Sequence, residues 1–152
     1  MKYIAYGANM SSEIMKYRCK GARFLGVGVL EGYRLLFKGK EPLAYATIEK
    51  WAGYKVPYVL WEITATDETA LDKFEGYPKS YQKDVVTIEH DGQQFLAMYY
   101  HKSADESIGQ PMTHYIDVLA TAYYRFSFDI EILNEALRLS NDYYQINGGQ
   151  NK

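Results

Sequence analysis

The chain has 152 residues, which is enough for one domain of ordinary size. Hydrophobic residues make up 47% and charged residues 24%, so the composition excludes wholesale disorder. The formal net charge of −2 argues against a dedicated nucleic-acid binder, and no apolar run approaches the ~18 residues of a membrane-spanning helix. The apolar stretch at the start of the sequence is too short for a signal peptide, and one cysteine permits no internal disulfide. We therefore expect a cytoplasmic protein with neither nucleic-acid nor membrane partners.

The first half of the chain predicts a strand, a helix and then a series of strands. Residues 2–6 are rich in strand formers, and Gly7-Ala8-Asn9 leads into a helix at about 11–19 with a serine N-cap. Further strands are expected at 24–30, 33–37, 43–48 and 56–64. Glu31-Gly32 is a candidate two-residue hairpin turn between the first two of them.

The second half predicts a helix, a hairpin and a helical end. The helix runs over 67–75, with Thr66 or Asp67 as its cap and Gly76 at its end. Strands at 83–89 and 93–100 flank Asp91-Gly92, the strongest hairpin signal in the chain. The remaining segments are expected to be a loop at 102–111, helices from 113 to about 140 with a break at 127–129, and a flexible tail at 145–152.

About seven strands with interspersed helices predict an α+β fold. We expect one mixed, mostly antiparallel sheet curled into a small barrel and flanked by helices, forming a single domain over residues 1–144. The 16 tyrosines suit strand surfaces as well as pocket walls, and a Tyr-rich surface would also suit a homodimer.

Glu75 breaks a local rule of helix design. It lies four residues after Leu71, on the apolar face of the predicted helix, and at the C-terminal end where the helix dipole disfavours an anion. A carboxylate in that setting has a raised pKa, which suits a general acid or base. The alternative interpretation is that the helix ends one residue early and leaves Glu75 in solvent.

The turn after the first strand is a second candidate feature. Tyr6-Gly7-Ala8-Asn9 passes directly from strand to helix, and such turns present several backbone N–H groups to an anion or an oxyanion. An ordinary strand-to-helix turn is the competing interpretation. Among other polar residues, His90, His101 and His114 lack metal-site spacing, and Cys19 is expected to be a structural thiol. The basic residues Lys16, Arg18, Lys20 and Arg23 are expected to form a solvated helix face.

Six short motifs follow one another along the chain: Tyr6–Asn9, Met15–Cys19, Gly32–Phe37, Ala46–Ile48, Leu60–Ile63 and Leu71–Tyr77. In this order they resemble the gamma-glutamylcyclotransferase-like superfamily. The similarity runs from Tyr3 to about Leu137. In the first motif, Ala8 stands where the family usually has Ser, so a hydroxyl is missing there while the backbone donors remain.

The resemblance implies a small barrel-like α/β fold and a cyclotransferase reaction that needs no metal or organic cofactor. In this reaction the α-amino group of a γ-glutamyl amide attacks its own γ-carbonyl, which releases 5-oxoproline and an amine or amino acid. Glu75 corresponds to the family's catalytic glutamate, and the loop Tyr6–Asn9 would bind the substrate. Tyr99 would line the site, with Tyr81 as a second wall.

Two other functions stay open at this stage. One is a non-catalytic small-molecule binding or regulatory domain on the same scaffold, because a fold does not by itself determine an activity. The other is a different enzyme that acts on a modified γ-glutamyl group. The sequence does not identify the leaving group.

Overall fold

The computed structural model describes residues 1–147 of the chain. The contacts gather it into two compact units: unit 1 comprises Met1–Leu30 and Pro57–Ser103, and unit 2 comprises Glu31–Val56 and the chain from Ala104 onward. The expected single domain over 1–144 stays a prediction. Of the predicted tail, residues 145–147 belong to the last helix, and 148–152 lie outside the described residues.

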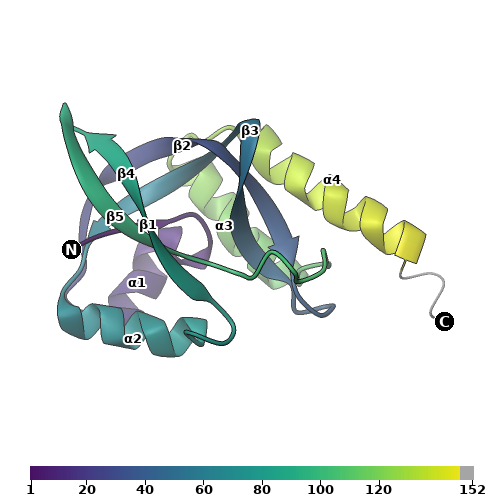
Figure 1. Ribbon diagram of the computed structural model, residues 1–152, viewed down its shortest axis with the longest axis horizontal. Helices are drawn as coiled ribbons and strands as arrows, with labels where there is room; N and C mark the ends of the chain where they lie inside the picture. The colour runs from purple at the N-terminus through teal and green to yellow at the C-terminus, as the bar shows by residue number, and fades with distance from the viewer. Residues whose placement is uncertain (148–152) are drawn as a thin grey trace. The chain divides into compact units, whose positions relative to one another are not determined.

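The strands of unit 1 meet around a short central strand. β1 (Lys2–Ala5) pairs antiparallel with β3 (Tyr45–Glu62) and parallel with β5 (Gln93–His101). β4 (Gln82–His90) and β5 form the predicted antiparallel hairpin (Figure 1). At its turn, Asp91 and Gly92 both have positive φ angles, 53° and 77°, as a tight hairpin turn requires.

The strand order is β2-β3-β1-β5-β4, in which β2 spans Arg23–Lys38. The predicted mixed α+β sheet is therefore confirmed, but within residues 1–147 the sheet remains open and the predicted closure into a barrel is wrong. Its two edge strands do approach each other: a Cβ added to Gly26 on β2 would lie 2.9 Å from the His90 ring on β4. At this point the His90 side chain lies close to β2, but β2 and β4 are not hydrogen-bonded neighbours in the strand order.

Two long strands replace four predicted ones. β2 continues straight through the predicted hairpin at Glu31-Gly32, and β3 covers both strands expected at 43–48 and 56–64. Gly32 takes a positive φ of 80° inside the strand, so the glycine is a local irregularity of β2 and not a turn. Both strands pass from one unit into the other.

Unit 1 also holds three short helical segments. They are η1 (Ala8–Met10), α1 (Ser12–Arg18) and α2 (Ala65–Glu75), and α1 lies beside α2 below the strands in Figure 1. The α2 helix begins two residues earlier than predicted because Thr64 is its N-cap. The Thr64 hydroxyl accepts a hydrogen bond from Asp67 N, and the Asp67 carboxylate accepts one from Thr64 N.

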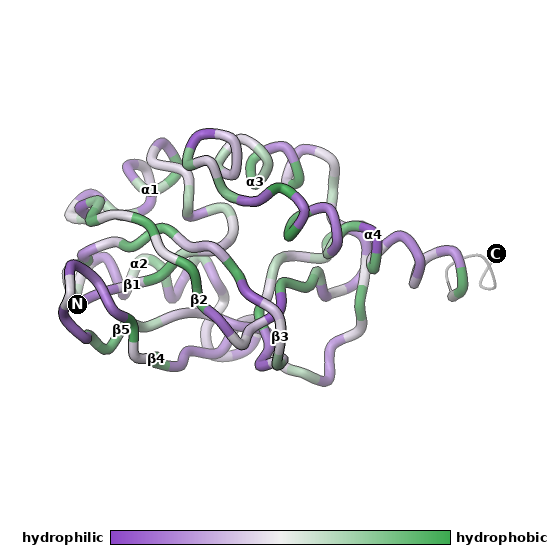
Figure 2. The backbone as a smooth tube through the Cα atoms, turned by 90° about the horizontal axis from the view of Figure 1, so that it is seen from above, coloured by the Kyte–Doolittle hydropathy of each residue, from purple (hydrophilic) through white to green (hydrophobic). Residues whose placement is uncertain are grey.

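Unit 2 contains α3 (Thr113–Arg125) and α4 (Ile130–Asn147), separated by the predicted break. Figure 2 shows that α4 alternates between hydrophobic and hydrophilic residues, as an amphipathic helix does. It runs beyond the predicted end at Ser140 because no Gly or Pro interrupts the sequence before Gly148. None of the helices in the described part of the chain is long and apolar enough to cross a membrane.

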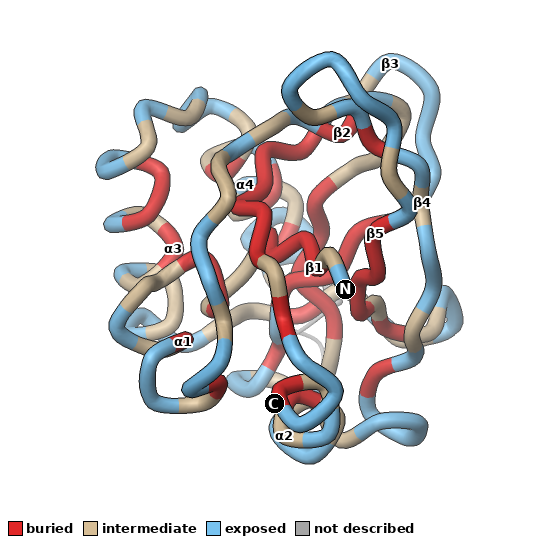
Figure 3. The backbone as a smooth tube through the Cα atoms, turned by 90° about the vertical axis from the view of Figure 1, so that its left-hand side faces the viewer, coloured by how far each residue is buried: buried red, intermediate tan, exposed pale blue. Residues whose placement is uncertain are grey.

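The core of unit 1 lies along β1, β5 and the adjoining part of β3. Figure 3 shows buried residues along β1 and β5, while β4 is mostly exposed. The side chains of Ile4 and Leu60 are 1% or less exposed. Cys19 is also buried in this unit, and burial raises the pKa of its thiol to about 11, as expected of a structural cysteine.

Candidate functional site

Glu75 is the last residue of α2, so the helix does not end before it. Gly76 follows with φ 68° and ψ 34°, in the left-handed region that glycine adopts without strain. The Gly76 and Tyr77 N–H groups bond back to the carbonyls of Lys73 and Asp72, at 3.3 and 2.9 Å. This glycine-based C-cap holds the end of the helix, and the Glu75 side chain lies half-buried.

The amide of Asn9 connects the strand-to-helix loop to Glu75. Its Nδ2 donates to Tyr3 Oη at 2.9 Å and to Glu75 Oε1 at 3.3 Å. Its Oδ1 accepts from Arg18 Nη1 at 2.9 Å, and its backbone carbonyl accepts from Trp61 Nε1 at 3.0 Å. Asn9 is only 3% exposed, so both ends of a buried amide have partners.

The surroundings of Glu75 raise its proton affinity. Burial is the largest influence and raises the pKa of Glu75 to about 7, while the positive charges of Arg18 and Lys102 oppose that rise. Burial and the negative charge of Glu75 raise the pKa of the Tyr3 phenol far above its ordinary value, so this phenol stays neutral. A carboxyl group that titrates near neutral pH can both accept and return a proton under physiological conditions.

A second polar network lies next to this carboxylate. The Tyr100 hydroxyl donates to Asp72 Oδ1 at 2.6 Å, and Lys83 Nζ lies 3.0 Å from Asp72 and 2.8 Å from Glu68. The rings of Tyr3 and Tyr100 meet edge to face at 5.9 Å. Burial and the neighbouring Asp72 raise the pKa of Tyr100 well above its usual range, so its hydroxyl also remains a donor.

The predicted substrate loop folds into the short helix η1. Gly7 is its N-cap, and the N–H groups of Met10 and Ser11 bond back to the carbonyls of Gly7 and Ala8. The N–H groups of residues 7–9 precede the first hydrogen bond of η1, so they do not donate to carbonyls within this helix. Tyr6 is buried just before the loop, and its hydroxyl donates to the backbone carbonyl of Tyr100.

The two predicted wall residues have different positions. Lys102 links Tyr81 to Glu75. Its ammonium group lies 5.2 Å from the centre of the Tyr81 ring, and its positive charge opposes the rise in the pKa of Glu75. Tyr99 belongs to the regular β5 ladder, in which successive side chains alternate between faces. Its ring therefore lies on the face opposite Tyr100, 5.6 Å from the ring of His101.

Arg18 differs from the sequence expectation. Instead of being part of a solvated basic face, it binds Asn9, and its guanidinium lies 4.6 Å from the centre of the Phe74 ring. Sequence reasoning also missed Tyr3, Tyr100 and Lys102 as neighbours of Glu75, and Asp72 as the partner of Tyr100. The Leu-Asp-x-x-Glu spacing was one available signal, since Asp72 lies one helical turn before Glu75.

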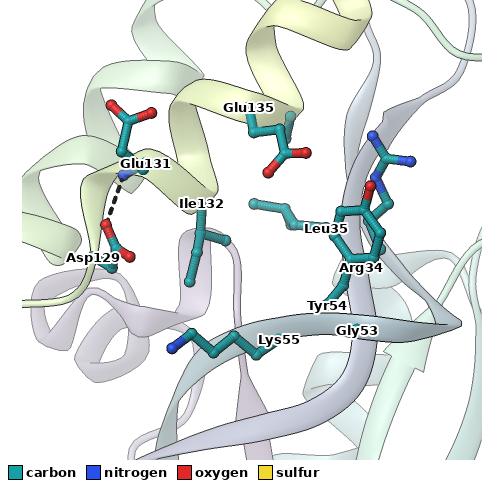
Figure 4. A pocket seen from close by; sticks show the side chains of 10 residues that line it. Arg34, Leu35, Gly53, Tyr54, Lys55, Asp129, Glu131, Ile132 and Glu135 are labelled. Carbon is teal, nitrogen blue, oxygen red and sulfur yellow. Dashed lines mark hydrogen bonds between the residues drawn. The ribbon is translucent and has the colours of Figure 1, made fainter.

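Unit 2 carries a separate pocket of about 480 Å³, drawn in Figure 4. In that view Ile132 and Glu135 of α4 face Arg34, Leu35 and Tyr54 of the two long strands. The Arg34 guanidinium lies 4.5 Å from the centre of the Tyr54 ring. The pocket contains none of the predicted site residues. Among residues 1–147, the structure holds no group of three or more His, Cys, Asp or Glu side chains arranged to hold a metal ion.

The open mixed sheet with α1 and α2 defines an α+β protein of the γ-glutamyl cyclotransferase fold. The chain belongs to the family described as "Gamma-glutamyl cyclotransferase, AIG2-like", whose model matches residues 3–132. This confirms the resemblance that the six sequence motifs indicated.

Individual relatives are distant. A "Gamma-glutamylcyclotransferase" from Bos taurus is 30% identical over 115 residues, which are 70% of this chain and 61% of that protein, so the chain spans about three fifths of its length. A solved "Gamma-glutamyl cyclotransferase" superposes with a TM-score of 0.78 at 21% identity, covering 90% of this chain and 85% of that one. An AIG2-like protein from Mus musculus superposes with a TM-score of 0.56 at 22% identity, covering 70% and 78%. At these identities, the two structures support the fold.

Proposed function

We propose that the protein is a γ-glutamyl cyclotransferase that converts a γ-glutamyl amide into 5-oxoproline and a free amine or amino acid. The observation that carries this proposal is Glu75, a half-buried carboxyl group whose pKa of about 7 suits proton transfer, in a chain of this family. The reaction requires a group that takes up a proton and later returns it, and Glu75 does this by alternating between its two protonation states.

The proposed reaction has two proton transfers through one carboxylate. The substrate α-ammonium group has a pKa near ~8 and must lose a proton before its nitrogen can attack the γ-carbonyl carbon. This first proton goes to the solvent, and Glu75 takes the second proton of the attacking nitrogen while the new C–N bond closes the five-membered ring. Protonated Glu75 then gives the proton to the leaving nitrogen, and the original amide C–N bond breaks. Because both reacting groups belong to one molecule, effective molarities of ~10⁵ M or more are attainable once the substrate is held in the right conformation.

The loop Gly7-Ala8-Asn9 is proposed to stabilise the charges of the substrate. The N–H groups at the start of η1 are suited to bind the developing oxyanion or the α-carboxylate. Ala8 offers no hydroxyl, so in this proposal the loop acts through its backbone. Tyr6 and Tyr81 are proposed as walls of the substrate site, whereas the role of Tyr99, on the face of β5 opposite Tyr100, stays a prediction. The reaction as written needs neither a metal nor an organic cofactor.

The proposal is tested by measuring 5-oxoproline release by mass spectrometry from a panel of γ-glutamyl amides. The panel includes γ-glutamyl amino acids, the lysine ε-amide, polyamine amides and glutathione. We expect release from one class, and a loss of at least ~10²-fold in Glu75→Gln, which keeps the side-chain shape and removes the proton acceptor.

Glu89→Gln is the matched control for this experiment, because Glu89 is an exposed carboxylate on β4 outside the proposed site. It should retain full activity. Activity in folded Glu75→Gln would contradict the assignment of the base. No release from any substrate by the folded wild type would contradict the proposed activity and favour the binding domain or an enzyme for a modified γ-glutamyl group.

A further inference from the structure

Arg18 is the neighbour that fixes the oxygen end of the Asn9 amide. A carboxamide has an acceptor oxygen and a donor nitrogen on one planar group, and it can present either end to a given partner. Arg18 has only donors, so the amide turns its oxygen toward Arg18, where Nη1 and Oδ1 are 2.9 Å apart. The opposite orientation would set two donors against each other and would face an oxygen toward the Glu75 carboxylate.

Arg18 is itself held in place from two sides. It is the last residue of α1, where a positive charge is favourable next to the carboxyl end of the helix. Its guanidinium also lies over the ring of Phe74, 4.6 Å from the ring centre. Phe74 is itself 52% exposed and presents the face of its ring to the guanidinium. The guanidinium of Arg18 on α1 thus contacts Asn9 of η1 and Phe74 of α2, and Phe74 directly precedes Glu75.

We propose that Arg18 is a positioning residue of this site, whose guanidinium orients the Asn9 amide so that Nδ2 faces the Glu75 carboxylate and Tyr3. The inference rests on the proposed function only in taking Glu75 as the reacting carboxylate. Arg18 does not touch the reacting atoms in this assignment; it acts through Asn9, in addition to the direct effect of its charge on Glu75.

The consequence is a change in the proton affinity of Glu75. A donor at 3.3 Å favours the ionised carboxylate, and so do the positive charges of Arg18 and Lys102, while burial opposes ionisation. The phenols of Tyr3 and Tyr100 also face this cluster and stay neutral. Beyond them lie the buried Cys19 thiol next to Tyr3, and the ion pair of Asp72 with Lys83 next to Tyr100. Without Arg18, nothing holds the amide oxygen away from Glu75, so a protonated Glu75 can donate to it, and the favourable charge of Arg18 is lost as well; both changes raise the pKa of Glu75.

The test is a direct titration of Glu75 by ¹³C NMR of its side-chain carboxyl, assigned by the loss of its signal in Glu75→Gln. Arg18→Met should raise the pKa of Glu75 by about one unit, the effect expected from losing a favourable charge and hydrogen bond. Arg18→Lys, which keeps a cationic donor, should titrate closer to the wild type. Lys16→Met removes an exposed charge from the same helix and should change nothing.

A double-mutant cycle with Asn9→Ala separates positioning from a through-space effect of the charge. If Arg18 acts through Asn9, the shift caused by Arg18→Met shrinks to less than half when Asn9 is already alanine. A shift of equal size in both backgrounds would overturn the positioning role, and so would the absence of any shift in the Arg18→Met variant.

The activity profile adds a readout that a merely structural role would not alter. A one-unit rise from about 7 lowers the ionised fraction of Glu75 by ~9-fold at pH 6 but by only ~1.1-fold at pH 9. The loss of kcat/KM in Arg18→Met should follow this pH dependence, whereas a general loss of folded structure would reduce it equally at all pH values. If no substrate is turned over but the titrations behave as described, the proposed activity fails and the role of Arg18 stands.

Discussion

Glu75 combines a useful proton affinity with a cost in stability. Its carboxyl has an ordinary pKa of 4.5 in the unfolded chain and about 7 in the folded protein. Between these two values the folded protein holds a proton that the unfolded chain has lost, so the unfolding free energy decreases as the pH rises through this window. The difference amounts to as much as about 3 kcal/mol above pH 7. The site is thus less stable in the ionised state in which Glu75 is expected to act as a base.

This cost predicts the pH dependence of stability in a variant. Glu75→Gln cannot ionise, so it should match the wild type near pH 4.5 and exceed its unfolding free energy by up to about 3 kcal/mol at pH 8. Urea unfolding at several pH values measures the difference, and Glu89→Gln serves as the exposed control. A constant difference between Glu75→Gln and the wild type from pH 4.5 to 8 would show that the pKa of Glu75 is not raised.

At the scale of secondary-structure elements, the position of Glu75 depends on both ends of α2. At its start, the buried Asp67 carboxylate accepts from Thr64 N at 3.0 Å and from Gly21 N at 3.1 Å. Asp67 therefore caps α2 and also ties it to the segment that follows α1. At the other end, the glycine cap at Gly76 stops the helix directly after Glu75.

Removing the first of these anchors should destabilise the protein. We expect Asp67→Ala to lower the unfolding free energy by about 2 kcal/mol, because it removes the capping box and leaves the Gly21 N–H without its acceptor. Thr69→Ala, on the exposed side of the same helix, should cost no more than about 0.5 kcal/mol. Urea unfolding of both variants checks this expectation, and equal stabilities would contradict it.

At the scale of the whole molecule, β2 and β3 connect the two compact units. Each of these strands begins in one unit and ends in the other, so neither unit has a full set of strands of its own. From this continuity we propose one folded domain over residues 1–144.

The thermal unfolding of the protein tests that expectation. We predict one cooperative transition, with equal calorimetric and van't Hoff enthalpies, because unfolding either unit would disrupt strands that the other needs. Two resolved transitions, or a calorimetric enthalpy well above the van't Hoff value, would show that the units unfold separately.

Local sequence signals determined several elements of this fold. Asp91-Gly92 adopts positive φ angles at low cost and formed the predicted hairpin, and Gly76 ended α2 where expected. The location of Glu75 at the end of that helix could be deduced for the same reason. Glu31-Gly32 carries a similar signal, but there β2 continues, because the strand pairing of the folded sheet outweighs a weak local preference.

Only the tertiary structure decided which residues surround Glu75. Asn9 and Arg18 come from the N-terminal segment η1–α1 and Lys102 follows β5, all far in the chain from Glu75, and the sequence contains no local signal for their meeting with it. The same holds for the open sheet, whose order places the first strand between the third and the fifth. Propensities and caps act over a few neighbouring residues, so the sequence by itself determined the helices, the main hairpin, the family and the candidate glutamate. The burial that raises the pKa of that glutamate, and the arginine that orients its partner, depend on packing between distant segments and were decided by the fold.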